Sequence, residues 1–299
     1  MRLFRALFAE QEKYMKLLRF GPAGHEKPGL VDASGVIRDL SSVVDDISGA
    51  TLLPANLAKL REVKTDVLPT APAGARIGPC VAGVGKVICV GLNYSDHAKE
   101  SNMAIPTEPI LFMKPTSSIC GPNDHVEIPR GAEKTDWEVE LGVVIGKTAK
   151  YVSKESALDY VAGYCVVNDV SERAFQLERG GQWDKGKGHD TFAPIGPWLV
   201  TADEVADPQN LAMWLEVDGH RYQNGSTRTM IFDVATLVSY ISQFMTLQPG
   251  DVIATGTPPG VGLGQKPPVY LHAGQTMKLG IEGLGEQQQL TVPAKGPAA

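Results

Sequence analysis

The 299-residue sequence lacks the features that would direct it to a membrane or to nucleic acid. Its wholly apolar runs are short and fall far below the 18 or so residues that a membrane-spanning helix needs. It has no block rich in lysine and arginine, and 34 acidic residues outnumber 28 basic ones, for a formal net charge of −6. Such a charge balance disfavours polyanionic partners. We therefore expect neither a nucleic-acid partner nor a membrane partner.

Cysteine is also scarce, and no two cysteines form a CxxC pair, which argues against a zinc ribbon or a thioredoxin-like centre. All four lie in apolar segments and are predicted to be reduced core residues of a cytoplasmic protein. They are Cys80, Cys89, Cys120 and Cys165.

The N-terminus lacks a long apolar segment and a small-residue cleavage site, so a signal peptide is not expected. Residues 1–14 carry Glu10 and Glu12, and a strand-like run follows Met15. We interpret Met15 as the working start and residues 1–14 as an upstream extension that is not native to the mature chain.

Common catalytic and nucleotide-binding motifs are absent or incomplete. No G-x-S-x-G occurs, which argues against a serine hydrolase. The stretch 181–188 resembles a P-loop but has Gly188 where Ser or Thr is required. The glycine-rich stretch 260–264 is not G-x-G-x-x-G, and no βαβ pattern surrounds it. Nucleotide binding is rejected on both counts.

Glycine (32) and proline (21) are abundant and scattered, which indicates many turns between short strands. We predict an α+β, mainly β fold, with a small β-rich domain and linker over residues 15–80 and a larger mixed-sheet domain over 85–296. Asp218-Gly219 between alternating residues predicts a hairpin. Strands are expected at 16–20, 86–91, 110–114, 137–146, 160–167, 213–223, 251–256 and 276–282. Helices are expected at 54–62, 153–159, 171–179 and 233–244, the last with Asp233 as its N-cap.

Two glutamates share one face of a predicted strand. In WEVELGVVIG (137–146), the strand period places Glu138 and Glu140 on the same side. An exposed carboxylate face is the ordinary reading of such a pair. Here the strand continues as an unbroken apolar run, which indicates burial on both faces. Two buried carboxylates repel each other unless a cation lies between them, and a hard divalent ion is suitable.

Asp169 follows the apolar run 160–167 and could join this pair as a third oxygen ligand. The alternative is that Asp169 or Ser171 caps the helix predicted next. Alone, Asp169 would be read as a cap; beside Glu138 and Glu140 it is read as a ligand.

His97 and Glu100 stand three residues apart on a short helix after the strand at 86–91. At that spacing they share one helical face, and a glutamate that orients a histidine is a common general-base pair. The alternatives are a surface ion pair and a zinc site, although no third ligand has zinc spacing.

Seven segments together resemble the fumarylacetoacetate hydrolase family and cover nearly all of residues 86–292. They are GLNYSDHAKE (91–100), ILFMKP (110–115), WEVELGVVIG (137–146), VVNDVSERAFQ (166–176), KGKGHDTFAPIGP (185–197), NGSTRTMIF (224–232) and GDVIATGTPPGVG (250–262).

The resemblance implies a mixed-sheet catalytic domain that binds Mg²⁺ or Mn²⁺. It implies roles for nine residues: Glu138, Glu140 and Asp169 as metal ligands, His97 and Glu100 as a water-activating dyad on a lid, Lys187 at the developing oxyanion, and Gln176, Thr257 and Lys114 near the substrate. It also implies a homodimer.

Two outlying segments, KLLRFGPAGHEKPGLVD (16–32) and HAGQTMKLGIEGLGEQ (272–287), resemble the sugar-acid branch of the family. The expected reaction is therefore hydrolysis of a C–C bond in a 2-oxo or 2,4-dioxo acid, with a 2,4-diketo-3-deoxy sugar acid as the favoured substrate and pyruvate as a product. Ureidoglycolate lyase, acylpyruvate hydrolase, oxaloacetate decarboxylase and 2-oxo-acid isomerase activities stay open. A binding protein stabilised by metal, without turnover, is the alternative from another class.

Overall fold

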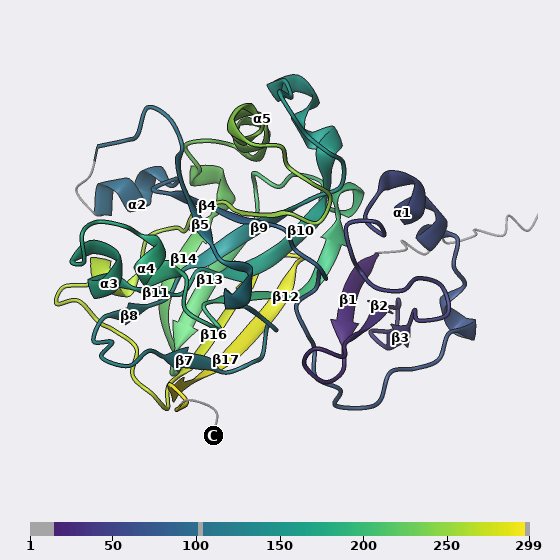
Figure 1. The fold of residues 1–299 in the computed structure, drawn as a ribbon, viewed down its shortest axis with the longest axis horizontal. Helices are drawn as coiled ribbons and strands as arrows, with labels where there is room; N and C mark the ends of the chain where they lie inside the picture. Colours follow the sequence, from purple (N-terminus) through teal and green to yellow (C-terminus); the bar gives the residue numbers. More distant parts are fainter. Residues whose placement is uncertain (1–14, 101–103, 297–299) are drawn as a thin grey trace, which may run out of the picture.

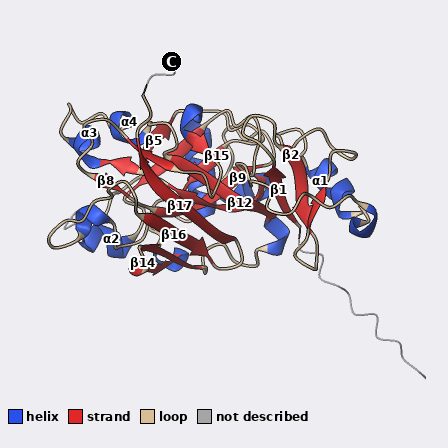
Figure 2. Cartoon of the chain, turned by 90° about the horizontal axis from the view of Figure 1, so that it is seen from below, coloured by secondary structure: helices blue, strands red, loops and turns tan. Residues whose placement is uncertain are grey.

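The computed structural model describes residues 15–100 and 104–296, so the interpretation of residues 1–14 lies outside the described residues. Strands form the body of the molecule, and the helices lie around its periphery (Figure 1, Figure 2). The predicted α+β, mainly β fold is confirmed. No helix within the described ranges is long and apolar enough to cross a membrane.

One large mixed sheet runs through the molecule, and the short strand β6 (Ile119–Cys120) joins it by pairing with β12. The order of its other strands is β3 (Ile37–Asp39), β2 (Lys27–Val31), β1 (Lys16–Phe20), β12 (Ala193–Thr201), β10 (Val161–Asn168), β9 (Val139–Ile145), β15 (Val252–Ala254), β4 (Val87–Gly91) and β5 (Ile110–Lys114).

The remaining strands form two smaller sheets. The five-stranded sheet has the order β14 (His220–Ser226), β13 (Ala212–Val217), β16 (Thr276–Ile281), β17 (Gly285–Pro293) and β7 (Val126–Ile128), and the two-stranded sheet pairs β11 (Ser171–Glu172) with β8 (Thr135–Asp136). Strands β13 and β14 form the predicted hairpin. Its turn residues Asp218 and Gly219 have φ values of 49° and 80°, the left-handed conformation that a two-residue hairpin turn needs.

The central strands β9 and β10 are buried along their whole length, as their apolar sequences predict. Alternate side chains enter different cores. Val139 and Leu141 of β9 pack with the five-stranded sheet and the helix at 234–244, whereas Val144 packs with the N-terminal segment. Glu140 therefore leaves the sheet on the face opposite Val139 and Leu141, inside the protein.

The helices confirm the sequence interpretation in part. They are α1 (Pro54–Arg61), α2 (Ser95–Glu100), α3 (Arg173–Leu177), α4 (Asp184–Lys187) and α5 (Val234–Phe244). Asp233 caps α5 as predicted, by accepting a hydrogen bond from Thr236 N. The helix expected at 153–159 is the 3-10 helix η3 (Lys154–Tyr160). The alternative of Asp169 or Ser171 as a helix cap is wrong, because Glu172 caps α3 and accepts from Ala174 N.

The N-terminal elements β1–β3 and α1 lie together at one end of the molecule, away from α2, α3 and α4 (Figure 1). Strand β1 pairs with β12, so this end is continuous with the large sheet. In the stretch 67–85, which composition marks as a linker, Cys80 and Val81 are buried in the same core as the N-terminal segment. All four cysteines are free and buried, as predicted.

The pairing directions bring four chain segments to one edge of the large sheet. Strand β15 is parallel to β4, and β9 is antiparallel to both β15 and β10. The carboxyl ends of β4, β10 and β15 therefore meet the start of β9 at that edge. The segments that leave this edge carry the candidate residues at 93–100, 138–140, 168–176 and 255–264.

Candidate active site

A cavity of about 500 Å³ opens at this edge, and most of the predicted site residues line it. His97, Glu100, Glu138, Glu140, Gln176, Lys187 and Thr257 are among the lining residues. Lys114 and Asp169 are not among them; they are buried behind the cavity and bonded to each other, with Lys114 Nζ 2.5 Å from Asp169 Oδ1.

Three carboxylates converge at the floor of the cavity, two of them lining it and Asp169 buried directly behind them. One oxygen from each of Glu138, Glu140 and Asp169 lies within 4.8 Å of the other two, and all three side chains are buried. Glu138 directly precedes β9, Glu140 lies within it, and Asp169 follows β10. Antiparallel pairing of Asn168 with Val139 sets the two strand ends side by side, which accounts for the convergence of Asp169 with glutamates 31 and 29 residues before it in sequence.

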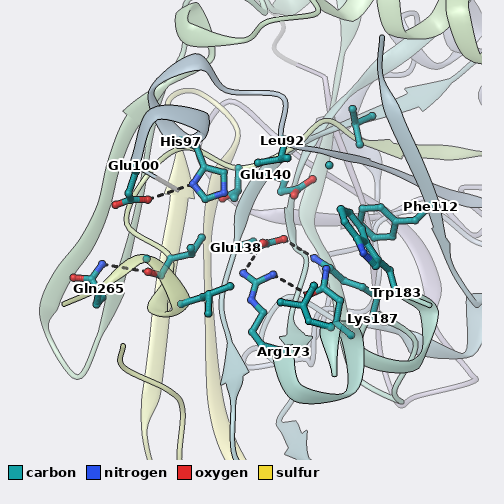
Figure 3. A pocket seen from close by; sticks show the side chains of 18 of the residues that line it. Leu92, His97, Glu100, Phe112, Glu138, Glu140, Arg173, Trp183, Lys187 and Gln265 are labelled. Atoms are coloured by element: carbon teal, nitrogen blue, oxygen red, sulfur yellow. Dashed lines mark hydrogen bonds and ion pairs between the residues drawn. The ribbon is translucent and has the colours of Figure 1, made fainter. Parts of the chain in front are cut away.

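Buried cations surround two of these carboxylates. Glu138 lies between Arg173 and Lys187, each 2.7 Å away (Figure 3). Lys187 Nζ is also 2.8 Å from Asp169 Oδ2, so this one ammonium group bridges two carboxylates. Burial alone would raise the pKa of Glu138, but the charges of Lys187 and Arg173 outweigh it and hold the pKa well below its usual range. Burial would lower the pKa of Lys187, yet Asp169 and Glu138 raise it and keep the ammonium charged.

Glu140 has a different environment. Gly256 N–H donates to its Oε2 atom at 2.8 Å, and no salt bridge to it is found among the described residues. Burial raises the pKa of Glu140 well above its ordinary value, and the charges of Asp169 and Glu138 add to the effect. Its ionised form therefore has no cation in direct contact among the described residues, and the charge of Lys187 offsets the repulsion only in part.

The donor set suits a hard divalent cation. It consists of carboxylate oxygens only, the ligands that Mg²⁺ and Mn²⁺ prefer, and each carboxylate offers further lone pairs beyond its present hydrogen bonds. A positive charge at this point would relieve the repulsion of Glu140 by Asp169 and Glu138. The residues present fit a metal ion held by Glu138, Glu140 and Asp169.

His97 and Glu100 face this cluster from α2, on the far side of the cavity from the aromatic wall of Phe112 and Trp183 (Figure 3). His97 Nδ1 lies 3.3 Å from Glu100 Oε2. His97 is 9% exposed, so the surface-pair reading does not describe it. Burial would raise the pKa of Glu100, but hydrogen bonds from His97 and from Gly260 N–H lower it. Glu100 is thus held as a charged acceptor that orients His97.

Gln176 and Thr257 lie on the cavity wall, where each is fixed by a neighbour. Gln176 Oε1 accepts a hydrogen bond from Arg173 Nη1 at 3.1 Å. Thr257 Oγ1 donates to Val139 O at 2.9 Å, and Gln223 Nε2 donates to the same hydroxyl at 2.7 Å.

Sequence reasoning missed two charged residues at the site, Arg173 and Asp136. Arg173 lies in the quoted stretch 166–176, three residues before Gln176 and on the same helical face. Asp136, Glu138 and Glu140 keep the two-residue period of a strand, and this pattern is visible in the sequence. Asp136 Oδ2 accepts from Arg173 Nε at 2.8 Å.

Comparison with known proteins identifies the family of the chain that forms this site. The family model described as fumarylacetoacetate (FAA) hydrolase, C-terminal, matches residues 86–292. The chain belongs to the fumarylacetoacetate hydrolase family. That family match spans every residue of the site.

Individual relatives cover almost the whole chain. A protein of Burkholderia multivorans described as "Putative hydrolase" is 67% identical over 282 residues, 94% of this chain and all of the relative. The solved fumarylacetoacetate hydrolase of Exiguobacterium antarcticum is 38% identical with a TM-score of 0.81. Maleylpyruvate hydrolase of Sphingobium sp. SYK-6, solved in complex with manganese(II) ion and pyruvate, is 30% identical with a TM-score of 0.79. Both structures cover 94% of this chain and 100% of their own.

Proposed function

We propose that the protein is a divalent-metal-dependent hydrolase that cleaves a C–C bond in a 2,4-dioxo acid and releases pyruvate. The observation that carries the proposal is the buried cluster of Glu138, Glu140 and Asp169 beside the His97–Glu100 pair at one cavity. A metal-binding protein without turnover would have no use for a general-base pair whose histidine is buried at the same cavity. The manganese and pyruvate in the Sphingobium relative support the same assignment.

The favoured substrate is a 2,4-diketo-3-deoxy sugar acid, which rests on the resemblance of residues 16–32 and 272–287 to the sugar-acid branch. We further propose Mg²⁺ or Mn²⁺ as the cofactor, a homodimer as the working form and the cytoplasm as its location. Sedimentation of the purified chain tests the homodimer, and the activity panel below tests the substrate.

Each residue of the site has a chemical part in this reaction. When bound by Glu138, Glu140 and Asp169, a divalent ion would supply Lewis-acid polarisation and a template for the oxo acid. His97, oriented by Glu100, takes a proton from water as the water oxygen bonds to the distal carbonyl carbon.

The bond between that carbon and the methylene carbon then breaks, and its electron pair forms the enolate of pyruvate. Lys187, fixed as a cation beside Glu138 and Asp169, stabilises the enolate charge. Protonation of the enolate carbon gives pyruvate, and the other product is a carboxylic acid. The aromatic wall of Phe112 and Trp183 excludes water from one side of the cavity.

The test is release of pyruvate from a panel of 2,4-dioxo acids, with Mg²⁺ or Mn²⁺ and again with EDTA. Ureidoglycolate runs alongside and is scored for glyoxylate, and oxaloacetate is scored for pyruvate and CO₂. Pyruvate that depends on metal and on an intact 2,4-dioxo acid supports the proposal. Glyoxylate alone would establish the lyase instead, and metal binding without any product would remove the proposed reaction.

A further inference from the structure

The glycine-rich stretch 260–264 forms a wall of the cavity and binds two carboxylates through its backbone. Gly260 N–H donates to both carboxylate oxygens of Glu100, at 3.1 and 3.2 Å. Gly262 N–H and Leu263 N–H donate to Asp136, at 2.6 and 3.0 Å. One short loop therefore holds the glutamate of the dyad and a second, fully buried carboxylate.

The loop has a backbone that only glycine allows at its critical points. Gly260 has a φ of +103°, and a Cβ there would lie 2.0 Å from Tyr222 O. A Cβ on Gly264 would lie 3.0 Å from the carboxylate of Glu100. The indole of Trp137 donates to Gly260 O at 3.1 Å and anchors the loop from the other side. The glycines thus let the backbone approach Glu100 closely.

Asp136 connects this loop to the metal-binding carboxylates. One of its oxygens accepts from Arg173 Nε at 2.8 Å, and Arg173 Nη2 donates in turn to Glu138 at 2.7 Å. Trp137 N–H gives Asp136 a further hydrogen bond at 2.8 Å. A buried carboxylate is costly unless its oxygens are satisfied, and this one has four donors. Asp136 itself is not among the residues that line the cavity.

We propose that Asp136 is a positioning residue that fixes the 260–264 loop, and with it Glu100, in its position relative to Arg173 and Glu138. It is the shared partner of the two halves of the site: the dyad on one side and the carboxylate cluster on the other. Catalysis is sensitive to displacements of about 1 Å, which can lower a rate about 100-fold. The inference rests on the proposed function for its kinetic readout, and it has a second readout that needs no turnover.

The test variant is Asp136→Asn, which preserves size and replaces one acceptor oxygen by an NH₂ group. Because every neighbour of Asp136 is a donor, the amide necessarily faces at least one of them. The matched control is Asp32→Asn at the other end of the molecule. Asp32 also accepts from two loop amides, Ser34 N and Val36 N, and from an arginine Nε. Both substitutions disturb hydrogen bonds from loop amides and from an arginine, but only Asp136 lies beside the candidate site.

We expect Asp136→Asn to lower kcat at saturating metal by about 10-fold to 100-fold, with KM changed by less than about threefold. Asp32→Asn should lower the melting temperature and leave both kinetic constants unchanged. An unchanged kcat in Asp136→Asn, or an equal loss in Asp32→Asn, would overturn the proposal.

A double-mutant cycle with Glu100→Gln separates positioning from a general loss of packing. If Asp136 acts through Glu100, the double variant should be no more than about threefold slower than Glu100→Gln alone. Two independent defects would multiply instead, and that result would also overturn the proposal.

Hydrogen exchange supplies the readout that is independent of turnover. In Asp136→Asn, amides of residues 260–264 should exchange faster, and so should those of residues 94–100, which share no direct bond with Asp136. Asp32→Asn should leave both segments unchanged. If the wild type consumes none of the test acids, the proposed reaction is wrong. The hydrogen exchange of residues 94–100 in Asp136→Asn still tests the positioning role of Asp136 in that case. Unchanged protection of residues 94–100 in Asp136→Asn would refute it.

Discussion

Replacement of Glu140 by glutamine is the sharpest single test of the metal site. Glu138 and Asp169 each have buried cations as partners, whereas Glu140 has the Gly256 amide. The change to glutamine keeps the size of the side chain and one acceptor oxygen, so that this amide can still be bound. The variant therefore removes one negative charge with little change in shape, and its consequences differ in sign with and without metal.

Without metal, Glu140→Gln is expected to stabilise the protein. Burial and the charges of Asp169 and Glu138 raise the pKa of Glu140 above its ordinary 4.5 in the folded state. Stability associated with this group is therefore fully present below about pH 4.5 and is lost as pH rises through the higher folded pKa. At neutral pH we expect the variant to gain about 1 kcal/mol or more, since one pKa unit corresponds to about 1.4 kcal/mol. That is roughly 2–4 °C in melting temperature for a chain of this size, and near pH 4 the gain should vanish.

With metal, the sign reverses. An ion present at about 100 times its dissociation constant stabilises the wild type by about 2.7 kcal/mol, or roughly 5–10 °C. Loss of one of three carboxylate ligands should weaken binding by about 100-fold or more, a larger effect than is usual for groups outside the ligand set. At the same ion concentration the variant would then retain about 0.4 kcal/mol, a shift of roughly 1 °C.

Thermal unfolding of the wild type and the variant, in EDTA and in Mn²⁺ and at pH 4 and pH 7.5, measures these changes. It gives the stability difference without metal and the metal-induced shift in melting temperature at each pH. The matched control is Glu26→Gln, a partly buried glutamate that pairs with Arg19 and Arg76. Burial would raise the pKa of Glu26, but the bonds and charges of these arginines lower it, so its loss should destabilise the protein and leave the metal shift intact. A full Mn²⁺ shift in Glu140→Gln, or a destabilisation in EDTA like that of the control, would refute the assigned site.

Three further predictions follow from the same geometry. His97→Asn should lower kcat by about 10²-fold to 10⁴-fold in the pyruvate assay and keep the Mn²⁺-induced thermal shift; loss of that shift would contradict its assignment to the dyad. Lys187→Met leaves Glu138 and Asp169 with less positive charge around them. The variant should therefore be less stable without metal by about 3 kcal/mol or more in denaturant unfolding, and should bind Mn²⁺ more tightly when measured by calorimetry. Weaker Mn²⁺ binding would argue against Lys187 as the counter-charge of these two carboxylates. Trp183→Ala should raise KM about tenfold with kcat little changed, and a selective loss of kcat would assign the ring to the chemical step instead.

Local sequence patterns predicted the parts of the fold that local physics determines. The unbroken apolar run after Glu140 indicated a strand buried on both faces, and β9 has that environment. Asp218-Gly219 indicated a tight turn because both residues accept positive φ. The segment at 153–159 was predicted to be helical, but seven residues do not separate a period of 3.0 from one of 3.6, and it forms a 3-10 helix.

The candidate site was predictable only where its residues come from one segment or from a family motif. The pairing of Lys187 with Asp169, or of Lys114 with Asp169, joins segments 18 and 55 residues apart and depends on the order of the strands. No local period encodes that order. The cap at Glu172 illustrates the same limit, because the choice among Asp169, Ser171 and Glu172 depends on where β11 places the start of the helix.

The charge balance of the buried network explains why Glu140 differs from its neighbours. Four carboxylates and three cations are joined or adjacent at the site. The carboxylates are Asp136, Glu138, Glu140 and Asp169, and the cations are Lys114, Arg173 and Lys187. With Glu140 protonated, as its raised pKa favours, the network is formally neutral without an ion. A divalent cation held by Glu138, Glu140 and Asp169 would favour the ionised form of Glu140 and would leave these seven groups with one net positive charge.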